Sequence, residues 1–134
     1  MTQITSFNLN GVDTPVSFIE HQIVKEGVTC DIYAFTNDPS KDLAIVVVEQ
    51  GFKTPLQKVL SGTETIEGYI SGVAILTVTG FDGTIRKFDY PGSSDTKIVV
   101  NIGQTMQWEA KSQLTFYELC TPPYTDGRFE NLTE

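Results

Sequence analysis

The sequence predicts an all-β domain, either a sandwich or a barrel, and three observations carry this prediction. Short segments rich in β-branched and aromatic residues recur along most of the chain. Turn pairs such as Asp82-Gly83, Pro91-Gly92 and Asp126-Gly127 separate them at short intervals. Helical periodicity is weak, and even its best candidate, residues 15–26, is rich in β-branched residues and is predicted to be a strand. Many short strands with frequent turns are typical of sandwiches and barrels.

The expected strands differ in how their two faces are covered. In residues 28–36 small apolar side chains alternate with Tyr33 and Phe35, which predicts a strand with two distinct faces. Residues 42–51 form a nearly continuous β-branched run, which favours a strand covered on both sides. Residues 65–72 and 73–80 are joined by a Ser-Gly turn and are predicted to form a hairpin. The remaining expected strands lie within residues 81–90, 96–103 and 113–120.

Length and charge restrict the classes of function. The 134 residues fit a single domain, 1–134, with a barrel core at about 43–120 and a C-terminal tail at 121–134. The formal net charge of −8 would repel nucleic acid and anionic membrane surfaces, so neither is expected as a partner. The longest apolar run, residues 43–48, is far short of the ~20 residues that span a bilayer. The first fifteen residues lack the basic and apolar regions of a secretory signal, and a cytoplasmic location is expected.

The two cysteines, Cys30 and Cys120, are too far apart in the sequence to form a local metal knuckle. We expect two small buried thiols in a reducing compartment. A disulfide between them is the alternative.

Two segments carry a resemblance to a known family. "GFKTPLQKVLSGTETIEGYISGVAILTV" (51–78) resembles the first motif of the cupin superfamily, in which a Thr-Pro-Leu leads into two histidines, a glutamate and a glycine turn. "IVVNIGQTMQWEAKSQLTFYELCTPPY" (98–124) is similar to the second motif. Both segments occur in the family's order and at its separation. The resemblance implies a double-stranded β-helix, or jelly-roll barrel, whose mouth holds ligands.

The family's metal-ligand positions hold residues that suit a metal poorly. Aligned with the two motifs, these positions are occupied by Gln57, Val59, Glu64 (or Thr65) and Met106. An aliphatic side chain and a thioether are not useful ligands for a divalent first-row metal, and the one histidine, His21, lies outside both motifs. We therefore expect no bound transition metal and no cofactor, while a loosely bound Ca²⁺ at the acidic surface stays open.

Two interpretations of the barrel interior stay open. In a strand, Met106 and Trp108 point to the same side, into the barrel. Either they fill the interior with their own bulk, or they form the floor and aromatic wall of a ligand pocket. The second interpretation adds Gln57, Val59, Glu64 and Tyr69 as pocket residues.

The C-terminal tail gives a further alternative. The last strand must stop at Cys120 or Thr121, because Pro122 and Pro123 cannot donate ladder hydrogen bonds. Beyond the strand, Phe129 and Leu132 offer apolar anchors. The tail is then either a tethered end or a flap near the mouth, with Tyr124 and Arg128 at the rim.

These observations favour a metal-free binding or assembly module for a small polar or sugar-like molecule. The alternative is an isomerase or lyase acting on a small sugar or carboxylic acid. Metal-free sugar-nucleotide isomerases of the family use a histidine–carboxylate pair, and here only His21 could be the base, with Asp31, Glu64 or Glu118 as its partner. The chain has only this one histidine and no metal-ligand set to serve in acid–base catalysis, so binding is the leading hypothesis. A homodimer is also expected, with an N-terminal strand, around residues 3–9 or 16–24, exchanged to cover residues 43–48.

Overall fold

The structure, a computed structural model, describes residues 3–132 as two antiparallel sheets. The seven-stranded sheet has the order β1-β2-β3-β4-β11-β6-β9. Its strands are β1 (Ser6–Leu9), β2 (Val12–Lys25), β3 (Val28–Phe35), β4 (Asp38–Val48), β11 (Leu114–Thr121), β6 (Glu64–Ser71) and β9 (Lys97–Val99). The five-stranded sheet has the order β12-β5-β10-β7-β8. Its strands are β12 (Phe129–Asn131), β5 (Gln57–Val59), β10 (Thr105–Ala110), β7 (Ala74–Thr79) and β8 (Ile85–Tyr90).

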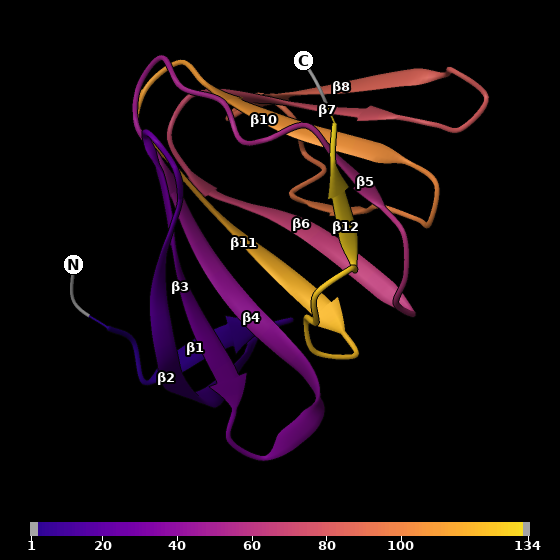
Figure 1. Ribbon diagram of the computed structural model, residues 1–134. Coiled ribbons are helices and arrows are strands. Elements are labelled where there is room, and N and C mark those ends of the chain that lie inside the picture. Colours follow the sequence, from indigo (N-terminus) through magenta and orange to yellow (C-terminus); the bar gives the residue numbers. More distant parts are fainter. Residues whose placement is uncertain (1–2, 133–134) are drawn as a thin grey trace.

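The two sheets curl toward each other, with β2, β3 and β4 on one side and β5, β10 and β12 on the other (Figure 1). Because side chains alternate along a strand, each strand has one face inside the barrel. Along β10 the buried residues are Met106 and Trp108, as the sequence predicted, together with Ala110. This jelly-roll arrangement confirms the predicted all-β fold. None of residues 3–132 belongs to a helix that could cross a membrane.

The apolar run in β4 is covered on both faces by residues of the same chain. Val46 and Val48 belong to the core inside the barrel, together with residues of the five-stranded sheet. Leu43 belongs to a second core on the outer face, which Phe7 and Val16 of the N-terminal strands help to form. There Phe7 meets Tyr117 edge to face, with ring centroids 5.0 Å apart. The cover that residues 43–48 require therefore comes from β1 and β2 within one subunit.

A bulge in β2 lets this strand serve both cores. Phe18 lies opposite Tyr33 and packs into the outer core, whereas Glu20, two residues later, lies opposite Ile32 and faces the barrel interior. Ile19 is the extra residue between them, and one extra residue reverses the alternation of the faces. The second half of β2 can therefore contribute to the interior of the barrel.

The predicted hairpin of residues 65–72 and 73–80 is wrong. β6 pairs with β11 and β9 in one sheet, whereas β7 pairs with β10 and β8 in the other. Gly72 carries the chain from sheet to sheet with φ +104°, and a Cβ there would lie 2.2 Å from the carbonyl oxygen of Gln113. The Ser-Gly pair is thus a turn, as predicted. It connects the two sheets because β6 and β7 each find their partners elsewhere in the chain.

The C-terminal tail closes one side of the barrel. β11 ends at Thr121, as the two prolines predicted, and β12 then pairs with β5. Phe129 packs against the inner core, so this part of the tail is docked. Tyr124 is half exposed, but Arg128 is only 2% exposed and does not lie at a rim. Its guanidinium donates hydrogen bonds to the carbonyl oxygens of Pro122 and Glu64, at 2.8 and 2.6 Å, and so ties the tail to β6.

Candidate functional site

A cavity of about 810 Å³ lies between the two sheets and is bordered by β2, β3, β4, β11 and the C-terminal tail. Most of its wall is apolar. The apolar wall includes Val28, Ile32, Ala44, Val46, Pro55, Met106, Phe116 and Phe129. The amide side chains of Gln22, Gln57 and Asn131 add hydrogen-bonding groups, and Gln57 donates to Asn131 at 3.0 Å. A concave, mainly apolar site with a few polar groups is the usual form of a small-molecule site.

Only two of the six residues predicted to form the ligand pocket line this cavity, namely Gln57 and Met106. Val59 and Trp108 are buried in the inner core, each only 1% exposed. Tyr69 is half-buried and donates a hydrogen bond to the carbonyl oxygen of Gly72 at 2.6 Å, outside the cavity lining. Glu64 is exposed, and its neighbour Thr65 is buried beside Arg128.

The half of the barrel around Trp108 is packed solid. The Trp108 ring stacks on Phe116 with centroids 4.6 Å apart and lies 5.6 Å from the Tyr90 ring, which in turn stacks on Tyr69. Its indole N–H donates to Oε1 of Glu67 at 3.0 Å. Aromatic rings therefore fill the half of the interior around Trp108, whereas the cavity occupies the other half and is not bordered by Trp108.

Two carboxyl groups stand opposite each other where the packed half meets the cavity. Glu67 in β6 and Glu118 in β11 are cross-strand partners, and both line the cavity. Glu67 is only 2% exposed, and Oε2 accepts no hydrogen bond from an N–H or O–H of residues 3–132. Burial, followed by the charge of Glu118, raises the pKa of Glu67 well above its ordinary value. Glu67 therefore keeps its proton in conditions where an exposed glutamate has lost it.

The sequence held a signal for Glu67 that the family alignment did not use. Glu67 lies two residues before Tyr69 on β6, so both side chains point to the same face of the strand. The family's glutamate position, however, led to Glu64, which lies on the exposed side of this strand. Alternation along β6 identifies the inward-facing carboxylate correctly, whereas residue counting from the motif does not.

Acidic groups dominate the rest of the cavity. Glu20, Asp38 and Asp42 also line it, and Lys41 is the one basic residue in the lining that the described residues form. Lys41 is already paired with Asp38, with Nζ 3.1 Å from the carboxylate. Burial raises the pKa of Asp42, although its carboxylate accepts a hydrogen bond from the backbone N–H of Tyr124. The electrostatic field of the cavity therefore favours neutral or cationic molecules over anions.

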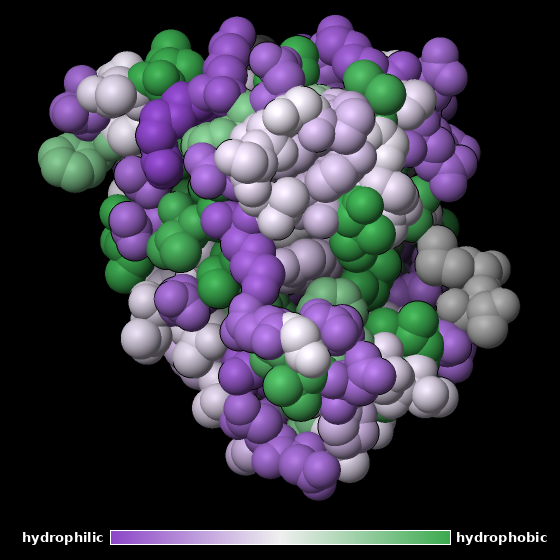
Figure 2. Space-filling view, turned by 180° about the vertical axis from the view of Figure 1, so that it is seen from behind, coloured by the Kyte–Doolittle hydropathy of each residue, from purple (hydrophilic) through white to green (hydrophobic). Residues whose placement is uncertain are grey.

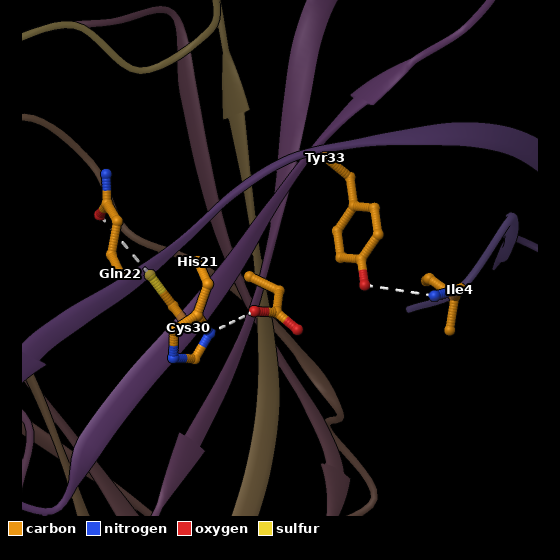
Figure 3. A network of polar contacts seen from close by, with 6 residues as sticks. Ile4, His21, Gln22, Cys30 and Tyr33 are labelled. Carbon is orange, nitrogen blue, oxygen red and sulfur yellow. Dashed lines mark hydrogen bonds and ion pairs between the residues drawn. The ribbon is translucent and has the colours of Figure 1, made fainter. Parts of the chain in front are cut away.

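Both cysteines are free and buried, and both line the cavity. This confirms the expectation of two small buried thiols. Desolvation, followed by the charge of Glu118, raises the pKa of Cys30 to about 12 and that of Cys120 further still. Because the thiolate is the reactive form, neither cysteine is activated as a nucleophile. The Cys30 thiol instead lies 3.7 Å from the amide oxygen of Gln22, a contact seen in Figure 3.

His21 lies apart from the cavity, on the outer face of the sheet. Its Nδ1 is 2.6 Å from the Asp31 carboxylate across β2 and β3, and the dashed line from the His21 ring in Figure 3 marks this contact. Of the three carboxylates considered as its partner, the structure selects Asp31. The pair does not border the cavity, so it cannot exchange a proton with a molecule bound there.

The positions that hold a metal in the family do not form a metal site here. Val59 and Met106 are buried in the core, and Glu64 points outward. No group of three or more His, Cys, Asp or Glu side chains within residues 3–132 is arranged to hold a metal ion. The donor set therefore does not fit a transition metal.

No protein-family model matches the chain, and no curated protein matches it. Solved structures do match. Oxalate decarboxylase from Bacillus subtilis at pH 4.6 is 26% identical, with a TM-score of 0.66 over 83% of this chain and 29% of that enzyme. A structure of the same enzyme from a study of its Mn(II) centres is 26% identical, with a TM-score of 0.66 over 81% of this chain. A tryptophan-to-tyrosine variant of that enzyme is 27% identical, with a TM-score of 0.66 over 82% of this chain.

The two curled sheets and the cavity between them define the class, a small double-stranded β-helix domain. Together with the similarity to oxalate decarboxylase, they show that the chain belongs to the cupin superfamily. The chain corresponds to only 29% of the length of that enzyme. The activity of the whole enzyme therefore does not transfer to this chain.

Proposed function

We propose that this cupin domain binds a small, largely apolar molecule in the cavity between its sheets, without a transition metal. The observation that carries the proposal is a cavity of about 810 Å³ with apolar walls and a few hydrogen-bonding groups. A cavity of that volume lies within the range of pockets that enclose drug-sized ligands.

The alternative, an isomerase or lyase acting on a small sugar or carboxylic acid, has weaker support. Acidic residues outnumber basic ones around the cavity, which opposes the binding of a carboxylate. The described lining contains no histidine, and the cysteine thiols have raised pKa values. A sugar could still bind through the amide side chains, so sugars belong in the binding test.

A thermal-shift screen with sugars, sugar nucleotides, carboxylic acids, amines and neutral apolar compounds tests the proposal. At least one class should raise the melting temperature of the parent protein, because a ligand that binds only the native state stabilises it. Ala44→Phe places a ring in the cavity and should abolish the shift. Ile102→Phe is the matched control, because Ile102 is 57% exposed and lies outside the cavity lining. If no class shifts the parent protein, the proposed function is wrong.

Metal independence has its own test. The purified protein should contain less than about a tenth of an equivalent of Mn, Fe, Ni, Cu or Zn by elemental analysis, because the ligand positions lack suitable donors. Treatment with a chelator should leave the thermal shifts unchanged. Near-stoichiometric metal that is lost on Glu64→Ala would contradict this part of the proposal.

We also propose that the domain forms a homodimer through the second half of β2. β1 pairs with β2 only over residues 12–15, so β2 beyond that point has one edge without a strand partner among the described residues. Ile19 and Ile23 on this segment are 56% and 77% exposed. A second copy could continue the sheet along this edge with two-fold symmetry. On the face seen in Figure 2, by contrast, hydrophobic side chains lie in small groups among hydrophilic ones.

A further inference from the structure

The carboxyl pair formed by Glu67 and Glu118 lacks a basic partner. Oε1 of Glu67 accepts the indole N–H of Trp108, whereas Oε2 receives no donor from an N–H or O–H of residues 3–132. The cross-strand neighbour of Glu67 is Glu118, a second carboxyl group that also lines the cavity. Because Glu67 is only 2% exposed and lies opposite a second carboxyl group, it can ionise at low cost only if a cation binds beside it, and otherwise it stays protonated.

The other charged and titratable groups that line the cavity do not neutralise the pair. They comprise Glu20 from β2, Cys30 from β3, Asp38, Lys41 and Asp42 from β4, Cys120 from β11 and Tyr124 from the tail. Five of these are carboxyl, thiol or phenol groups whose ionisation would add negative charge, and a sixth, Asp38, binds the one cation, Lys41. The β10 strand contributes only the neutral indole of Trp108 to the pair. No basic residue of residues 3–132 stands beside the pair, so a cation that neutralises it would come from a bound molecule.

The space beside the pair suits an amine that carries an apolar body. Ala44 and Phe116 lie next to Glu118 on the inner faces of β4 and β11, and Ile32 follows on β3. An ammonium group has three donors and can therefore bond both carboxylates at once. Its hydrocarbon part would then lie against the apolar wall. A sugar would place hydroxyl groups against that wall, and a carboxylic acid would add a third negative charge.

We propose that Glu67 and Glu118 together anchor the protonated amino group of a small apolar amine. This inference rests on the proposed function, because it names the ligand class of the same cavity. Without a bound cation Glu67 is the carboxyl group that carries the proton, because burial and the charge of Glu118 raise its pKa. When the amine binds as its ammonium ion, the O–H bond of Glu67 breaks and the proton passes to the buffer. The two carboxylates then accept N–H bonds from the ligand.

Proton release gives a measurable signature. Burial raises the pKa of Glu67 well above its ordinary value, so at any pH below this raised pKa the entering cation displaces a proton. Binding should therefore tighten as pH rises from 6 to 8, where a simple alkylamine remains protonated. Calorimetry in two buffers with different ionisation enthalpies should show release of close to one proton per amine bound. The parent protein alone suffices for this measurement.

Three probes of the same shape separate the ligand classes: phenethylamine, phenethyl alcohol and 3-phenylpropionate. We expect the amine to bind at least about tenfold more tightly than the alcohol, which corresponds to about 1.4 kcal/mol. The carboxylate should bind more weakly than the alcohol. The indole N–H of Trp108 bonds to Glu67, so amine binding should also shift the emission of this tryptophan.

Glu67→Gln and Glu118→Gln should each weaken amine binding by about tenfold or more and change alcohol binding by less than about twofold. Glu130→Gln is the matched control, because Glu130 is exposed on β12, lies outside the cavity lining and changes the net charge equally. Circular dichroism checks that each variant is folded. Amine affinity that is unchanged in both cavity variants, or amine binding without proton release, overturns the inference. Binding of alcohols or sugars but not of amines also overturns it, while the proposed function stands. If neither these probes nor any class in the thermal-shift screen binds, both the inference and the proposed function are refuted.

Discussion

Replacement of Trp108 by alanine tests most directly how the barrel interior is built. The side chain is 1% exposed and stacks on Phe116 at 4.6 Å. It also supplies the donor to Oε1 of Glu67. Trp108→Ala therefore removes a large buried ring and, at the same time, the hydrogen bond of a buried carboxyl group.

The two losses have separate magnitudes. A buried tryptophan truncated to alanine costs about 3–5 kcal/mol. A buried polar atom left without its partner adds about 1–3 kcal/mol. A domain of 134 residues has a total free energy of unfolding of about 7–20 kcal/mol, so Trp108→Ala should remove a large share of it. Trp108→Phe keeps an aromatic ring and loses the donor, and should cost roughly 1–3 kcal/mol.

Urea unfolding followed by far-ultraviolet circular dichroism measures both variants, since their tryptophan fluorescence is lost. Val12→Ala is a suitable control, because Val12 is 64% exposed and its truncation should have little effect. A loss below about 2 kcal/mol for Trp108→Ala would refute the packed half of the barrel. It would mean instead that the ring borders an open pocket.

Three further predictions follow from the buried carboxyl, from one close contact and from the edge of β2. The pKa of Glu67 is raised in the folded state, so the parent protein should lose stability as pH rises above about 4.5, the ordinary value, until Glu67 ionises in the fold as well. Glu67→Gln removes this dependence. Chemical denaturation should therefore show that the free energy of unfolding of the variant rises relative to that of the parent between pH 4 and pH 8. An identical pH dependence of the two would contradict the assignment. Gly68→Ala places a Cβ 2.0 Å from the ring of Tyr117 and should cost about 1–3 kcal/mol in thermal unfolding. Gly92→Ala is the control, because the nearest atom to its added Cβ is 3.7 Å away and its φ is not left-handed. Sedimentation at micromolar concentration should give a dimer that Ile23→Lys dissociates, and a clean 15 kDa species for the parent protein would refute the proposed homodimer.

The sequence alone determined the fold class and the faces of most strands. Alternation in residues 28–36, the common side of Met106 and Trp108, and the proline pair after Thr121 predicted features that the structure confirms. These features are local, since a side chain points inward or outward according to its place along one strand. The motif positions also predicted that Gln57 and Met106 would border the interior.

Only the tertiary structure decided which strands are neighbours and which side chains meet. β6 and β7 are adjacent in sequence, yet they belong to different sheets, because strand pairing depends on partners far along the chain. The same long-range pairing sets Glu67 opposite Glu118, residues that no local pattern connects. It also buries Arg128 beneath the tail and sets His21 against Asp31 on the outer face. The sequence thus specified the inward-facing residues of individual strands, while the packing of distant strands created the cavity and its carboxyl pair.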